Sequence, residues 1–167
     1  MRIALVASLA VALAAATAGC GGDDKGGGGG DRLSNAEFVS QANAICKGAN
    51  DKAAAVKPDL PSSFDPTSAK ATDEQLDTFG DYLDEVVGIF RDEVGDLRDL
   101  NPPEAVDDDF NKTLSLVDET LNEGDEAAEA AHDADRDKLK DKLAESERHS
   151  NEADTIATKL GLTKCAE

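Results

Sequence analysis

The feature that most constrains the fold of this chain is a stripe of apolar residues that recurs at helical spacing. The stripe begins with a capping-box pattern, TDEQ at Thr72–Gln75, in which the threonine and glutamine side chains each bond the other residue's backbone. We expect a long amphipathic helix that ends before Pro102 and Pro103, because proline lacks an amide hydrogen and clashes with the preceding turn. The apolar positions, spaced by three or four residues, are Leu76, Phe79, Leu83, Val86, Phe90, Val94 and Leu97.

The segment before this helix has the same pattern. Ser34 and Glu37 form a second capping-box pair, and apolar residues follow at the helical period as far as Val56. This predicts a first helix from about residue 35 to Val56, which stops before Pro58. Residues 58–71 contain three prolines and predict a loop that is long for a compact domain. A site that determines partner specificity could lie there, although a plain crossover between helices is the simpler interpretation.

Two further stripes follow the prolines. Pro103 suits the first position of a third helix, and Gly124 predicts a bend or break within it, since glycine costs about 1 kcal/mol there. The fourth segment ends at Gly161 and Leu162, which is typical of a helix whose last residue is left-handed. The third stripe comprises Val106, Phe110, Leu114, Val117, Leu121, Ala128 and Ala131, and the fourth comprises Leu139, Leu143, Ala153, Ile156 and Leu160.

Four amphipathic segments without strand-like alternation predict an all-α fold, an antiparallel four-helix bundle built from residues 34–167. That length suits one domain with one modest core. The chain has no Trp, one Tyr and five Phe, so the core must consist mainly of Leu, Val, Ile and Ala.

The first twenty residues predict export and anchoring. Residues 1–19 read as a signal peptide, with positive Arg2, an apolar run too short to span a membrane, and small residues before Cys20. Ala18, Gly19 and Cys20 resemble the lipobox of bacterial lipoproteins, although Thr17 stands where leucine is most common. The resemblance implies that Cys20 carries lipid, which would hold the protein on the extracytoplasmic face of the cell membrane. Residues 20–33 would then include a Gly-rich flexible tether.

The alternative is cleavage after Ala18, which would release a secreted soluble protein without an anchor. The cysteine count favours lipidation, because an odd cysteine in an oxidising compartment needs a partner or a modification. If Cys20 carries lipid, Cys46 and Cys165 remain as a pair. In a bundle the tail after Gly161 can reach the first helix, so we predict a Cys46–Cys165 disulfide. It closes a loop of roughly 120 residues, for which chain entropy assigns about 4–5 kcal/mol at most.

Several features together resemble the small exported lipoproteins common in actinobacteria. They are the TAGC sequence at residues 17–20, the glycine-rich spacer, FVSQANAICKGAN at residues 38–50, the proline-rich crossover and the ending LGLTKCAE. The resemblance rests on short motifs and implies a helical, disulfide-closed domain at the cell surface. It brings no catalytic residues with it.

The charge of the chain excludes some partners. Asp and Glu total 36 against 17 Lys and Arg, a formal net charge of -19. Such a surface repels phosphate backbones and anionic lipid, so we expect no nucleic-acid binding and no adsorption through basic patches.

Three residues are weak candidates for a metal site: Glu129, His132 and His149. Glu129 and His132 form a Glu-x-x-His pair at helical spacing, the unit of di-iron bundles, but such sites need two pairs. His149 has Glu145 and Glu152 within a turn. Surface ion pairing is the simpler interpretation for all of them, so we predict no metal and no cofactor. The acidic runs 107–109 and 122–126 lack the ligand alternation and closing glutamate of a calcium loop.

No catalytic constellation stands out, since there is neither a G-x-S-x-G motif nor a phosphate-binding glycine loop. We therefore expect a non-enzyme with a binding or structural role at the cell envelope. Two rival hypotheses are a metal-binding or sensing bundle, and an accessory of a hydrolase or transferase with its site in the 58–71 loop.

Overall fold

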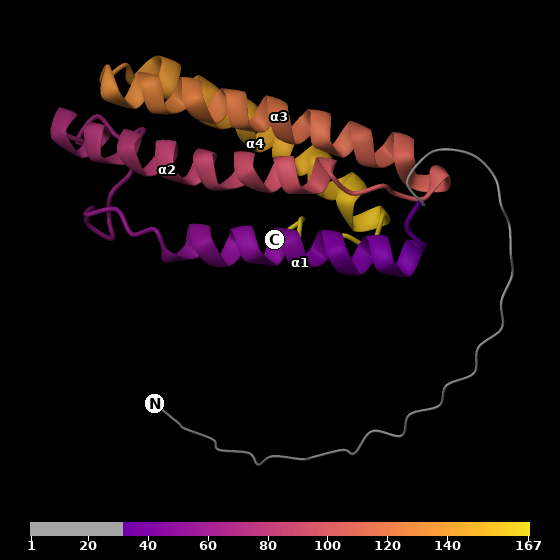
Figure 1. The fold of residues 1–167 in the computed structure, drawn as a ribbon. Helices are drawn as coiled ribbons and strands as arrows, with labels where there is room; N and C mark the ends of the chain where they lie inside the picture. Colours follow the sequence, from indigo (N-terminus) through magenta and orange to yellow (C-terminus); the bar gives the residue numbers. More distant parts are fainter. Residues whose placement is uncertain (1–31) are drawn as a thin grey trace, which may run out of the picture.

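The computed structural model describes residues 32–167, which form four helices and no strand. They are α1 (Asn35–Ala55), α2 (Asp73–Arg98), α3 (Glu104–His132) and α4 (Arg136–Lys159). The helices alternate in direction, so the predicted antiparallel bundle is confirmed (Figure 1). The predictions for residues 1–31, including the signal peptide, Cys20 and most of the tether, lie outside the described residues.

Both predicted capping boxes are present. The amide of Glu37 donates to Ser34 Oγ at 3.3 Å, and Ser34 N donates to Glu37 Oε2 at 3.0 Å. The amide of Gln75 donates to Thr72 Oγ1 at 3.2 Å, and Thr72 N donates to Gln75 Oε1 at 3.0 Å. Hydrogen bonds from the Ser34 side chain and backbone lower the pKa of the Glu37 carboxyl. The starts of α1 and α2 therefore follow from four-residue patterns alone.

The third helix differs from expectation in two respects. It begins at Glu104, so Pro103 is its N-cap and not its first helical residue, and it continues without a break through Gly124 to His132. Gly124 is buried, and a Cβ atom at this position would lie 2.7 Å from Val87 Cγ2. The expected interruption is thus absent, because the glycine allows α2 and α3 to approach closely.

Two helices end on a left-handed residue. After α4, Gly161 has φ 80° and the amide of Leu162 donates back to Ala157 O at 2.8 Å, as predicted. After α3, Ala134 adopts φ 53° and the amide of Asp135 donates to Ala130 O at 2.8 Å. Ala134 therefore adopts the left-handed conformation, which is unfavourable for a residue with a Cβ atom. The sequence did not indicate this helix end.

These two ends predict substitutions of opposite sign. We expect Gly161→Ala to lower the free energy of unfolding by about 1–2 kcal/mol, and Ala134→Gly to raise it by up to about 1 kcal/mol. Space is not limiting at Gly161, since an added Cβ would lie 3.7 Å from Val39. Urea unfolding followed by circular dichroism measures both changes. Two changes of the same sign would contradict the left-handed assignment.

The four helices are unevenly spaced. The helix α3 packs against both α2 and α4, while α1 lies further away and contacts α2 and the C-terminal segment (Figure 1). Phe38, near the start of α1, is fully buried, with its ring edge-on to Phe110 at a centroid distance of 4.9 Å. The opposite end of the bundle is rich in alanine. Its buried residues are Ala71, Leu76, Ala127, Ala130, Ala131 and Leu139.

The 58–71 loop packs against that alanine-rich end. The Phe64 ring lies 5.6 Å from the Phe79 ring, and Arg136 Nη2 donates to Ala71 O at 2.8 Å. The loop is therefore held against α2 by Phe64, near its middle, and against α4 by Ala71, at its C-terminal end. Within residues 32–167, no helix combines the length and apolar character needed to cross a membrane.

Candidate functional site

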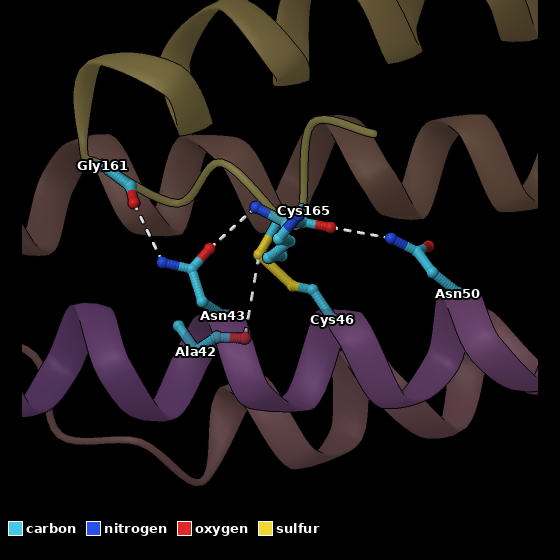
Figure 2. The surroundings of a disulfide bond; sticks show 7 residues. Ala42, Asn43, Cys46, Asn50, Gly161 and Cys165 are labelled. Carbon is cyan, nitrogen blue, oxygen red and sulfur yellow. Dashed lines mark hydrogen bonds between the residues drawn. A yellow bond between two sulfur atoms is a disulfide. The ribbon is translucent and has the colours of Figure 1, made fainter. Parts of the chain in front are cut away.

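The most distinctive local structure is the segment after α4, residues 161–167, which we call the C-terminal strap. It runs along α1, and side chains of α1 hold its backbone (Figure 2). Asn43 Nδ2 donates to Gly161 O at 3.0 Å, and Asn43 Oδ1 accepts from the amide of Lys164 at 2.8 Å. Asn50 Nδ2 donates to Lys164 O at 2.8 Å. The side chain of Asn43 thus pairs with both the carbonyl of Gly161 and the amide of Lys164, which would otherwise lack partners between α1 and the strap.

The predicted disulfide is confirmed and lies between these asparagines. Cys46 and Cys165 are bonded, with their Cα atoms 5.0 Å apart, and Cys46 is fully buried. Asn43, Cys46 and Asn50 are spaced by three and four residues, so they share one face of α1. That spacing is the sequence signal by which the strap-binding face could have been found.

A cavity of about 190 Å³ lies beside the strap. Its walls come from α2, α3, α4 and the strap, to which Asn50 of α1 adds one polar group. Most of the lining is apolar. The side chains that carry this character include Phe90, Val94, Leu114, Leu121, Ala157 and Leu162. Cys165 also lines the cavity, so the disulfide that secures the strap also secures one wall.

Two half-buried carboxyl groups reach the same cavity from different helices. Glu93 comes from α2 and Asp154 from α4. Burial, reinforced by the nearby charge of Asp96, raises the pKa of Glu93 to about 7. Burial alone raises the pKa of Asp154. Sequence reasoning missed both residues, because they look like the many other acids on these helices.

We expect Glu93→Gln to alter how stability depends on pH. The pKa of the Glu93 carboxyl is 4.5 in the unfolded chain and about 7 in the folded protein. Its contribution to the free energy of unfolding is therefore fully present below pH 4.5 and is lost as the pH rises through 7. Relative to the glutamine variant, the wild type should therefore lose about 1–2 kcal/mol between pH 4.5 and 8, after allowance for solvent screening.

Urea unfolding of both proteins at several pH values measures this difference. Glu85→Gln removes a charge from an exposed position on the same helix, and serves as the matched control. A difference between wild type and Glu93→Gln that stays constant from pH 4.5 to 8 would show that the carboxyl is not shielded from water.

The metal candidates from the sequence do not converge. Glu129 Oε2 pairs with Lys138 Nζ at 2.6 Å. His132 points instead to α2, with Nδ1 2.7 Å from Asp77 Oδ1 and Nε2 3.2 Å from Asp84 Oδ2. The hydrogen bond to Asp77, with a smaller contribution from Asp84, raises the pKa of His132. This favours a protonated imidazole, which donates to carboxylates and cannot bind a metal.

His149 lies in a separate place. Its Nδ1 atom is 2.9 Å from Glu123 Oε2, and its Nε2 atom is 3.5 Å from Glu119 Oε2. These contacts join α4 to α3, away from Glu129 and His132. Residues 32–167 contain one group of three potential ligands close enough to share an ion, Cys46, Cys165 and Glu93, and there the sulfurs are bonded to each other.

Residues of the two acidic runs considered for calcium also have protein partners. Asp107 Oδ2 accepts from Arg32 Nη1 at 2.9 Å, and Asp125 pairs with Arg91 of α2. Glu126 pairs with Lys142 of α4 at 2.9 Å. These contacts join neighbouring segments, as surface ion pairs do.

Comparison of the chain with protein-family profiles, curated proteins and solved structures finds no match.

Proposed function

We propose that this protein is a lipid-anchored, extracytoplasmic binding protein and not an enzyme. Its ligand would be a small, largely apolar molecule held between α2, α3, α4 and the strap. The observation that supports this proposal is the cavity of about 190 Å³. An engineered protein cavity of about 150 Å³ is known to bind benzene, so the volume suits one aromatic ring with a short substituent.

The anchoring part of the proposal rests on the sequence. Residues 1–19 have the layout of an export signal, and Cys20 follows small residues as in bacterial lipoproteins. With Cys46 and Cys165 bonded to each other, Cys20 is the one remaining cysteine of the chain. Lipidation would modify the Cys20 thiol, which otherwise has no cysteine partner within the chain in an oxidising compartment. We also propose that the chain is related to small exported lipoproteins of the actinobacterial type.

Intact mass tests the anchor. We expect the protein, expressed with its leader in a bacterium that processes lipoproteins, to begin at Cys20 and carry a diacylglyceryl group. Its mass should increase by two hydrogen atoms on reduction of the disulfide, and Cys20→Ser should abolish the lipid. A lipid-free chain that begins at Gly19 would overturn the anchor and favour a secreted soluble protein.

Fluorine NMR tests the cavity. We expect the signal of fluorobenzene to broaden when the exported chain carrying Cys20→Ser is added, and toluene to displace it. Ala157→Leu, at a buried lining position, should weaken binding at least tenfold by filling the cavity. Ala144→Leu places the same side chain at an exposed site on α4 and should have no effect. The absence of broadening at millimolar fluorobenzene would overturn the proposed binding function.

A further inference from the structure

The carboxyl groups in the cavity point to a more specific ligand. We infer that the bound molecule carries a protonated amine next to its apolar part, and that Glu93 and Asp154 recognise this amine. The inference rests on the proposed binding function, since it assigns a ligand class to the same cavity.

The first support is that both carboxyls lack a partner. Within residues 32–167, neither Glu93 nor Asp154 has a hydrogen bond or an ion pair with another side chain or with the backbone. The third carboxyl on the lining differs, because Glu167 is exposed and pairs with Lys164. Half-buried acids without a cation are costly to ionise, and a ligand ammonium would remove that cost.

The second support is the placement of these carboxyls. They come from α2 and α4, and they line a cavity whose other residues are mostly Leu, Val, Phe and Ala. A molecule with an apolar body therefore has room inside, while a positive group can reach an acid on either of two helices. Asn50 and Ser150 also line the cavity and can accept further N–H hydrogen bonds from a primary amine.

The third support is the sign of the charge. An anionic ligand would add its charge to two unpartnered carboxyls in a chain of net charge -19. A neutral ligand would leave both acids without a partner. A cation meets complementary charge at the site, and the field of the whole protein attracts it as well.

Three matched ligands separate the alternatives: 2-phenylethylamine, 2-phenylethanol and phenylacetate carry a positive, neutral and negative group on similar frames. We expect calorimetry on the exported chain with Cys20→Ser to show the amine binding at least tenfold tighter than the alcohol, and the acid weakest. Because the amine favours ionised carboxyls, its binding at pH 7 should release protons, which is seen by repeating the titration in buffers of different ionisation enthalpy.

Charge-removing variants complete the test. In the Glu93→Gln, Asp154→Asn double variant, we expect the amine to bind no tighter than the alcohol, and proton release to disappear. The control, Glu85→Gln with Asp141→Asn, removes two charges from exposed positions on the same helices and should keep the preference.

Equal binding of amine and alcohol to the wild type would overturn the inference and leave the cavity function standing. If fluorobenzene binds but none of the three ligands does, the inference alone is overturned; if fluorobenzene does not bind either, the proposed binding function is overturned as well. Survival of the amine preference in the double variant would also overturn the inference. So would loss of alcohol binding in that variant, which would mean that the carboxyls shape the cavity without recognising the amine.

Discussion

Replacing Cys46 and Cys165 together by alanine is expected to lower the free energy of unfolding by about 2–5 kcal/mol. The disulfide joins residues separated by 119 positions, so it restricts almost the whole described chain in the unfolded state. Net stabilities of domains are about 5–15 kcal/mol, so the loss is a large share of the total. Alanine is preferred to serine because Cys46 is fully buried, where a hydroxyl would need a partner.

Urea unfolding of the oxidised wild type and the double variant measures this loss. The reduced wild type is the control, and it should lose a similar amount. The same changes should weaken ligand binding, because Cys165 and Leu162 belong to the cavity wall. A loss below about 1 kcal/mol would contradict the expectation, and would mean that Asn43 and Asn50 hold the strap without the disulfide.

Truncation of Phe38 to alanine is expected to cost about 3–5 kcal/mol. The Phe38 ring is fully buried, packs edge-on against Phe110, and belongs to the core cluster that joins α1 to α3, α4 and the strap. Few other aromatic side chains are available to fill the space, since the described chain is poor in them. The cavity left behind would weaken the attachment of α1 more than that of any other helix.

Thermal and urea unfolding measure the effect of Phe38→Ala, with Phe64→Ala as the matched control. Phe64 lies half-buried in the 58–71 loop and contacts Phe79, so its truncation should cost less than half as much. Equal losses for the two variants would show that the contact between α1 and the other helices contributes little to stability.

The helices themselves were predictable from the sequence because helix signals are local. A capping box spans four residues, and an apolar stripe repeats every three to four, so TDEQ at Thr72–Gln75 and the residues after it sufficed to place α2. The ending of α4 at Gly161 was predictable for the same reason. The Cys46–Cys165 pair followed from counting cysteines and from the bundle topology.

Features that depend on which helices are neighbours were not predictable. From the sequence alone, Gly124 predicts a break in the helix. In the structure its missing side chain allows α3 to pack closely against Val87 of α2. Glu129 and His132 have a spacing known from metal sites. In the structure, however, His132 pairs with two aspartates of α2, and Glu129 forms an ion pair with Lys138. These partner residues lie dozens of positions away in the sequence or on another helix. The periodicity of one helix does not indicate which residues of another helix it will contact.

The sequence by itself therefore determined the helical class, the boundaries of most helices, the disulfide and the expectation of a lipid anchor. Only the tertiary structure decided that the strap lies on α1, that a cavity remains beside it, and that Glu93 and Asp154 line that cavity. The physical reason is that burial is a property of the assembled bundle. An acid such as Glu93 has the same neighbours in sequence as many exposed acids, and its raised pKa arises from the helices that enclose it.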